Sequence, residues 1–226
     1  SFFAGISTYC RDRLKDYIPH RSRQISWLPP AAKTSDLPSP SKDSKPLRLL
    51  YLGRLVRQHK CVHRLHGLAI ELEKLKTPFT LTIIGEGPER ESLESDFQSS
   101  NFSKKKIKFL GKISNDLLPG LLNAQDIILS VSNTEGSPNS ILEGMGAGLC
   151  PVAMDIDSGL RDFIVHNHNG IIVEQENTQG MANAIKELDQ NRSRLNSFKI
   201  MAHKSIASEF TVTSQISKLH SLILKS

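Results

Sequence analysis

Two basic residues follow the first strong apolar run of the chain, at a spacing that suits phosphate binding. The run LRLLYL (47–52) is typical of a buried strand, and Gly53, Arg54 and Lys60 come after it. Gly53 allows the chain to turn, and Lys60 lies near the start of the helix expected next. Two fixed cations beside a helix N-terminus can bind a phosphate or diphosphate. Taken alone, the loop is explained equally well as a solvated basic loop.

Two glutamates mark a second loop, which follows the apolar run DIILSV (126–131). Glu135 precedes a turn at Gly136, Pro138 suits the first turn of a helix, and Glu143 falls in the second turn. A carboxylate accepts two hydroxyl hydrogen bonds at once, so Glu143 suits sugar hydroxyls and Glu135 suits a second polyol, although both can also be surface charges. Free main-chain amides are expected to face a ligand here, and the helix dipole favours an anion. These amides belong to Gly136, Ser137, Asn139 and Ser140.

Glycines also follow two further apolar runs. Gly85 and Gly87 in GEGPER (85–90) let the backbone approach a ligand, but an ordinary turn between strand and helix is the favoured interpretation. Gly111 follows IKFL (107–110), where backbone groups can contact a nucleobase. No GxGxxG follows the first strand, and the chain contains no GxxxxGK[ST]. These absences disfavour a dinucleotide-dependent dehydrogenase and a P-loop enzyme.

The elements that must position these loops alternate from Leu47 onward. Strands are expected at 47–52, 79–84, 107–110, 126–131, 150–154 and 170–173. Helices are expected at about 62–75, from 88, at 114–123, 138–147, 158–165 and 177–189, and from about 192 to 225. Apolar strands alternating with helices predict an α/β fold with a doubly wound, Rossmann-like parallel sheet. Such a sheet binds its ligand beyond the carboxyl ends of the strands.

The net charge of +6 is concentrated at the two ends of the chain. Residues 1–34 hold six Lys or Arg against two Asp or Glu, and residues 177–226 hold seven against three. With an aromatic content of only 6%, this distribution disfavours a nucleic-acid partner. The segment TSDLPSPSKDSKP (34–46) is rich in Ser and Pro and is interpreted as a linker.

Cysteine and histidine spacing predicts no metal site and no disulfide framework. Cys10, Cys61 and Cys150 lack CxxC spacing and are expected to be reduced packing residues. His166 and His168 have no third ligand nearby, so a turn is expected there. No apolar stretch reaches the ~20 residues of a membrane helix, and the first residues do not form a signal peptide, so a cytoplasmic location is expected.

Taken in the order in which they occur along the chain, these motifs resemble the donor-binding half of a retaining GT-B glycosyltransferase. The resemblance rests on Arg54 and Lys60, GEGP at 85–88, and the two glutamates that enclose seven residues in EGSPNSILEGMGAG. The most similar group is the large family with the Glu-x7-Glu signature, family 4-like, and the likeness extends from about Leu47 to Phe210. It implies the C-terminal half of a GT-B fold. Residues 1–44 would be the remnant of an N-terminal acceptor domain plus linker, 45–208 the nucleotide-sugar-binding domain, and 209–226 a helix crossing back.

The resemblance also implies an activity and roles for the residues. A hexosyl group would move, with retention and without a metal or cofactor, from a nucleotide-diphosphate sugar to a saccharide or glycolipid in polysaccharide, lipopolysaccharide or glycan biosynthesis. UDP is the expected nucleotide, with GDP second. Arg54 and Lys60 would hold the diphosphate, Glu135 would position the sugar, and these three form the catalytic set. The donor-binding set is Gly53, Gly85, Gly111, Gly136, Ser137, Pro138, Asn139, Ser140 and Glu143, of which Glu143 would accept from the ribose hydroxyls.

The acceptor would bind through the N-terminal domain that is largely absent here, so this chain alone is expected to be inactive. The two basic ends would meet on the side of that domain and face an anionic membrane surface. The protein would then be a peripheral membrane protein. Another GT-B enzyme, such as a sugar-nucleotide epimerase or a sugar-phosphate synthase, and a non-catalytic nucleotide-sugar-binding protein stay open as alternatives.

The chain departs from the family pattern at three positions. Cys61 stands where the family usually has Gly, and Gly144 and Gly146 stand where it usually has Ala. Because Gly costs ~1 kcal/mol relative to Ala inside a helix, the two glycines are expected to loosen this helix.

Overall fold

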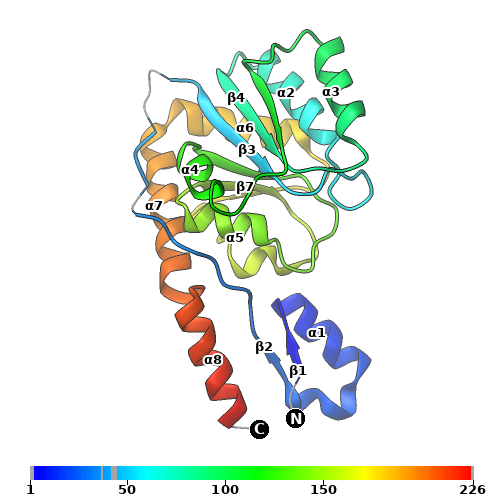
Figure 1. Cartoon of the computed structure of the whole chain (residues 1–226), viewed down its shortest axis with the longest axis vertical. Helices are drawn as coiled ribbons and strands as arrows, with labels where there is room; N and C mark the ends of the chain where they lie inside the picture. Colours follow the sequence, from blue (N-terminus) through cyan, green and yellow to red (C-terminus); the bar gives the residue numbers. More distant parts are fainter. Residues whose placement is uncertain (1–2, 37, 42–44, 225–226) are drawn as a thin grey trace.

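A six-stranded parallel sheet forms the centre of the protein (Figure 1). The computed structural model describes residues 3–36, 38–41 and 45–224. The strands are β3 (Leu47–Leu52), β4 (Phe79–Ile84), β5 (Ile107–Gly111), β6 (Ile127–Ser130), β7 (Cys150–Met154) and β8 (Ile171–Val173). They lie in the order β5-β4-β3-β6-β7-β8, with every neighbouring pair parallel. The predicted α/β fold and its doubly wound parallel sheet are therefore confirmed.

Helices cover both faces of this sheet. They are α2 (Arg64–Lys74), α3 (Arg90–Ser99), α4 (Leu118–Asn123), α5 (Asn139–Gly146), α6 (Thr178–Gln190) and α7 (Arg192–Glu209). Successive strand side chains point to opposite faces, so Leu49 and Tyr51 join the core under α2 and α6. Leu50 joins the opposite core under α4 and α5. The loops at the strand ends are thus held by two separate apolar layers.

Two of the expected helices differ in the structure. The helix predicted at 158–165 is wrong: only the short 3-10 turn η2 (Gly159–Asp162) forms there. The side-chain amide of Asn169 binds the backbone groups that a helix would use, because its Oδ1 accepts from Val165 N and its Nδ2 donates to Phe163 O. The helix expected at 114–123 begins later, at Leu118, with Pro119 in its first turn.

The first residues form a small unit of their own that docks on the main sheet domain. It contains β1 (Phe3–Gly5), α1 (Thr8–Tyr17), the 3-10 turn η1 (Pro19–Gln24) and β2 (Ile25–Trp27), with β1 and β2 parallel. The amide of Thr8 donates to Asp162 Oδ2 at 2.8 Å, which ties α1 to η2. The last helix, α8 (Val212–Leu224), returns to this unit: Lys218 Nζ lies 3.9 Å from the ring centroid of Trp27. The first and last segments therefore lie on one side of the protein (Figure 1).

The segment interpreted as a linker, 34–46, packs along α7 wherever the structure describes it. Four polar residues on one face of α7 hold backbone carbonyls of this segment. The contacts are His203 Nε2 with Ser35 O, Lys199 Nζ with Ser39 O, Asn196 Nδ2 with Ser41 O, and Arg192 Nη2 with Lys45 O, at 2.9 to 3.2 Å. Residues 37 and 42–44 of the segment lie outside the described residues. Within the described part of the chain, no helix is long and apolar enough to span a membrane.

Candidate functional site

The two loops singled out in the sequence leave the sheet side by side. β3 pairs with β6, with Tyr51 opposite Leu129, and the order of strands runs outward in opposite directions from these two. Open parallel sheets bind ligands at such a reversal, beyond the carboxyl ends of the strands. The loop after β3 carries Gly53 to Lys60, and the loop after β6 carries Ser132 to Pro138. Strand pairing therefore brings together residues that are more than 70 positions apart.

Lys60 and Glu135 form an ion pair between these loops. Lys60 Nζ lies 2.5 Å from Glu135 Oε1, and the same oxygen accepts from Ser132 Oγ at 2.8 Å. The amide of Asn133 donates to the His59 carbonyl at 2.8 Å, so the backbones of the two loops are joined as well. Both contacts fall on Oε1; Glu135 Oε2 has no hydrogen-bond partner in the described ranges and can accept from a ligand.

Arg54 extends from the same edge of the sheet. It is exposed, and its guanidinium makes no hydrogen bond or ion pair with any residue that the structure describes. Its carbonyl accepts from the hydroxyl of Tyr51 at 3.1 Å, which holds the backbone at this turn. Burial, together with the negative charge of Glu135, raises the pKa of Tyr51, so this hydroxyl stays protonated and remains a donor. Arg54 is thus a cation on a fixed backbone that is available to a ligand.

Glycines at the carboxyl ends of β3, β4 and β5 allow the backbone to pack closely. Gly53 N donates to Ile84 O, and Gly85 N donates to Gly111 O at 2.8 Å. A Cβ on Gly85 would lie 1.9 Å from the Gly53 carbonyl oxygen, and Gly85 has a φ of +139°. Backbone packing therefore accounts for Gly85, in agreement with the favoured interpretation of a turn.

Judged by the residues that the structure describes, the start of α5 provides three unpaired amides rather than the expected four. Asn139 N donates to Ser137 O at 3.0 Å, so the expectation that this amide is free is wrong. The tight turn at Pro138, which precedes the helix, brings these two groups together. The amides of Gly136, Ser137 and Ser140 have no acceptor within the described residues. The Ser137 hydroxyl is buried, also without a hydrogen-bond partner there.

Glu143 lies apart from the ion pair, on α5. It lines a cavity of about 420 Å³ together with Leu118 and Pro119 of α4 and the segment 31–35. Burial raises the pKa of Glu143 above its ordinary value. A half-buried carboxylate of this kind gains from hydroxyl donors that restore the hydrogen bonds lost from water.

Two contributors to this edge of the sheet were not found from the sequence. Cys10 of α1 lies with its Sγ 3.6 Å from the carbonyl oxygen of Gly136, so the first unit reaches the second loop. Arg64 donates to Asn133 Oδ1 at 2.6 Å and to Glu176 Oε1 at 2.6 Å. A cation in the first turn of a helix is disfavoured by the helix dipole. The position of Arg64 at the start of α2 was therefore a local signal in the sequence that its side chain would bind acidic or carbonyl oxygens.

Metal-ligating side chains do not gather in the described residues: no group of three or more His, Cys, Asp or Glu there is placed to hold a metal ion. His166 Nδ1 instead accepts from the amide of Ile172 at 3.0 Å, within the turn expected at this position. The three cysteines are free thiols, and Cys61 has a φ of +49°. That backbone conformation favours glycine, which explains why glycine suits this position.

Comparisons with known proteins identify relatives of this chain. The family model described as "Glycosyl transferases group 1" matches residues 33–205. A curated relative from Campylobacter jejuni, "GalNAc-alpha-(1->4)-GalNAc-alpha-(1->3)-diNAcBac-PP-undecaprenol alpha-1,4-N-acetyl-D-galactosaminyltransferase", is 26% identical over 146 residues. The alignment covers 65% of this chain and 39% of that relative, so the chain spans about two fifths of the relative's length.

Two solved structures share the fold at low sequence identity. TarM of S. aureus, crystallised with UDP and α-GlcNAc-glycerol, has a TM-score of 0.84 at 23% identity, covering 98% of this chain and 43% of that chain. HepE of Anabaena in complex with UDP has a TM-score of 0.85 at 17% identity, covering 100% of this chain and 64% of that chain. At this level of identity the likeness establishes the fold.

Proposed function

Since this chain belongs to the glycosyl transferases group 1 family, we propose that it is the donor-binding unit of a retaining hexosyltransferase. Its donor is a nucleotide-diphosphate sugar, with UDP as the nucleotide, and its acceptor is a saccharide or glycolipid. Arg54, Lys60 and Glu135 form the catalytic set. Residues 1–44 belong to the acceptor side of the full enzyme, 45–208 bind the donor, and 209–226 cross back toward the acceptor side.

The contact between Lys60 and Glu135 carries this proposal. It brings together a cation, a carboxylate oxygen and the amides of Gly136, Ser137 and Ser140 at the reversal of the strand order, and this oxygen and these amides have no partner among the described residues. A diphosphate needs the cations and amides, whereas a sugar needs the hydroxyl acceptor. The loop after β3 supplies the cations, and the loop after β6 with the start of α5 supplies the carboxylate and the amides, so neither loop alone supplies all three kinds of group.

The proposed chemistry is electrostatic. The bond between the sugar C1 and the diphosphate oxygen breaks with its electron pair on the diphosphate, and an acceptor oxygen bonds to C1 on the same face. The acceptor hydroxyl gives its proton to the departing diphosphate. Arg54 and Lys60, with the amides at the start of α5, stabilise the charge that develops there, because preorganised donors are worth most at the site of new charge. Glu135 accepts from a sugar hydroxyl and fixes the orientation of the ring.

The nucleoside end is assigned to Glu143 and to the backbone beyond β4 and β5. The half-buried carboxylate of Glu143 accepts from the ribose hydroxyls, and the backbone groups of Gly53 and Gly111 contact the nucleotide, whereas Gly85 is required for close packing against Gly53. UDP is the proposed nucleotide because UDP is present in the TarM and HepE structures. A lipid-linked acceptor is proposed because the Campylobacter relative is named for a PP-undecaprenol saccharide. The basic first and last segments would then face an anionic membrane surface.

Calorimetry with nucleotides tests this proposal directly. The chain is titrated with UDP, GDP and 2′-deoxy-UDP, each with and without magnesium, and the series is repeated with Glu143→Gln. UDP should bind best, and the substitution should weaken UDP more than deoxy-UDP. An equal loss of affinity for UDP and for deoxy-UDP would show that Glu143 does not bind the ribose hydroxyl. If no diphosphate binds at any concentration tested, the donor-binding proposal fails.

A further inference from the structure

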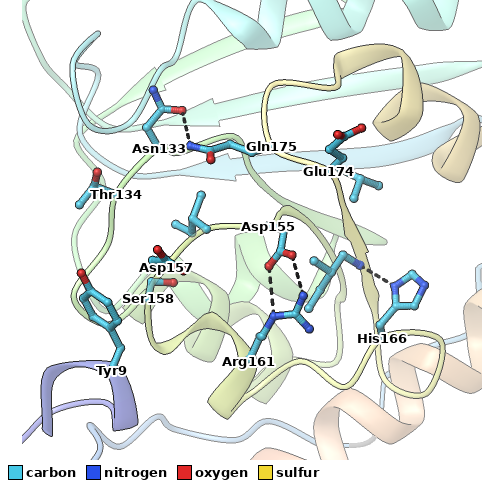
Figure 2. Close-up of a pocket in the computed structure, with 13 residues that line it drawn as sticks. Tyr9, Asn133, Thr134, Asp155, Asp157, Ser158, Arg161, His166, Glu174 and Gln175 are labelled. Carbon is cyan, nitrogen blue, oxygen red and sulfur yellow. Dashed lines mark hydrogen bonds and ion pairs between the residues drawn. The ribbon is translucent and has the colours of Figure 1, made fainter. Parts of the chain in front are cut away.

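A large cavity opens beside the loop after β6, and none of the predicted site residues lines it (Figure 2). Its volume is about 1000 Å³, and its walls come from the loops after β6, β7 and β8 and from α1. Asn133 and Thr134 line it and directly precede Glu135, so the cavity begins where the proposed sugar site ends. A ligand in this cavity would lie next to the group that is transferred.

The acidic side chains of the cavity differ in how far they are already paired. Asp155 is neutralised by Arg161, whose Nη2 and Nε lie 2.6 and 3.1 Å from its two oxygens. Asp157 has no hydrogen bond or ion pair to any residue within the described ranges. Among the described residues, the carboxylate of Glu174 accepts only from Asn177 Nδ2, at 3.5 Å. The lining as a whole holds three carboxylates and one guanidinium, a net charge of −2.

Hydrogen-bond donors and an aromatic ring complete the lining. Because His166 Nδ1 accepts from the Ile172 amide, the neutral imidazole carries its proton on Nε2 and can donate to a ligand. Tyr9 is 37% exposed and extends from α1 toward Thr134 (Figure 2). Free acceptors, a free donor and an aromatic face are the groups that a ring with hydroxyls on its edge and C–H groups on its face can use.

The placement of Tyr9 is held by the contacts of its own helix. The neighbouring Thr8 binds Asp162 through both its amide and its hydroxyl, and Cys10 contacts Gly136. Tyr9 therefore sits between two fixed neighbours, at the point where the first unit meets the sheet domain. These contacts fix the backbone that carries the Tyr9 side chain at the edge of the cavity.

We propose that this cavity is an acceptor subsite for neutral or amine-bearing saccharides and that Asp157 and Glu174 exclude acidic ones. The inference rests on the proposed transferase function and adds the class of acceptor. A carboxylate or phosphate on the saccharide would face these two exposed carboxylates, which have no cationic partner among the described residues, and like charges placed together at a binding site discriminate between ligands. On the donor side the exposed guanidinium of Arg54, which makes no ion pair with any described residue, offers the diphosphate a region of matching charge.

The test uses three probes of similar size and different charge. Tri-N-acetylchitotriose is neutral, its deacetylated counterpart is cationic, and a hyaluronan tetrasaccharide is anionic. Each is titrated by NMR into the chain with saturating UDP. The neutral and cationic probes should bind at least tenfold more tightly than the anionic one. Asp157→Asn should reduce the ratio between the affinities for the neutral and the anionic probe. Glu91→Gln on the surface of α3 is the matched control and should leave this ratio unchanged. Tyr9→Ala should weaken the neutral and cationic probes alike, with thermal unfolding measured to verify that the variant is folded.

The outcomes separate the subsite from the donor function. If UDP binds but no saccharide does, or the hyaluronan probe binds as well as the neutral one, the subsite proposal is wrong and the donor function stands. Saccharide binding that is indifferent to both Asp157→Asn and Tyr9→Ala would place the probe elsewhere and also overturn the subsite. If UDP itself fails to bind, the transferase proposal falls, and a saccharide bound in the cavity is then no acceptor.

Discussion

Lys60 and Glu135 are 75 residues apart in the chain, yet the Lys60 ammonium lies 2.5 Å from a carboxylate oxygen of Glu135. The side chains are 25% and 11% exposed, so water screens the pair only in part. The pair joins the loops that follow β3 and β6. Lys60 is consequently held in place before any ligand arrives, whereas Arg54 on the same loop is not.

Replacing Arg54 with Ala should weaken nucleotide-diphosphate binding by about 2–4 kcal/mol, roughly 30- to 1000-fold in Kd. The loss follows from the removal of charge-assisted hydrogen bonds to the diphosphate. Arg57→Ala is the matched control, because Arg57 is exposed on the same loop and makes only a 3.5 Å contact with Glu89. Calorimetry with UDP measures both variants. An unchanged affinity in Arg54→Ala, or an equal loss in Arg57→Ala, would contradict a specific diphosphate contact.

Stability should depend on pH through Glu143, whose pKa is raised by burial. A raised carboxyl pKa means that the folded state holds the proton more tightly than the unfolded chain, whose Glu titrates near about 4.3. The free energy of unfolding contributed by this proton is complete below that pH and is lost as the pH rises through the folded-state pKa. Glu143→Gln should therefore gain stability relative to wild type as the pH is raised from 4 to 7.

Urea denaturation of both proteins at several pH values measures this difference. Glu91→Gln removes one exposed carboxylate from α3 and serves as the control. A stability difference between Glu143→Gln and wild type that stays constant from pH 4 to 7 would show that the carboxyl titrates alike in both states.

Asp126→Asn should destabilise the protein by about 3–5 kcal/mol, because it leaves a buried ammonium without its counter-charge. Asp126 and Lys199 are 1% and 3% exposed at the side chain, and Lys199 Nζ lies 3.3 Å from Asp126 Oδ1. Arg48 donates to both oxygens of the same carboxylate. Asp155→Asn, which breaks the exposed pair with Arg161, should cost only roughly 0–1 kcal/mol. Comparable losses in the two variants, measured by denaturant unfolding, would argue against a buried charge cluster.

Two glycine-to-alanine changes in helices should shift the free energy of unfolding in opposite directions. Gly67 lies inside α2 with nothing within 4 Å of an added Cβ, so Gly67→Ala should stabilise by about 0.5–1 kcal/mol. A Cβ on Gly146 would lie 2.6 Å from the backbone oxygen of Lys33, so Gly146→Ala should destabilise by about 1–3 kcal/mol. Thermal unfolding gives both values. A stabilised Gly146→Ala would mean that the segment at Lys33 moves away at no cost.

Helix α5, which carries Gly144 and Gly146, illustrates where reasoning from the sequence was incomplete. Helix propensity alone predicts that Gly144 and Gly146 loosen α5. In the fold, a Cβ on Gly144 would come within 2.5 Å of the Ile128 side chain on β6, so the small residue allows the helix to approach the sheet. Propensity describes the helix by itself, and the close approach depends on a strand that the helix meets only after folding.

The sequence by itself determined the alternation of strands and helices, the loops that carry Arg54, Lys60 and Glu135, and the helix that carries Glu143. Local apolar periodicity reports which side chains are buried, and that information lies within a few residues of each position. It failed at 158–165, where the side chain of Asn169, just beyond this segment, binds the backbone in place of helical hydrogen bonds, a contact that apolar periodicity does not report.

Only the tertiary structure decided which loops meet. The contact of Lys60 with Glu135, the approach of Cys10 to Gly136, and the cavity that Tyr9 lines all depend on strand order and on the docking of α1. These relations join segments far apart in the chain. They are set by crossover connections and by the packing of two apolar layers, for which no short stretch of sequence holds the information.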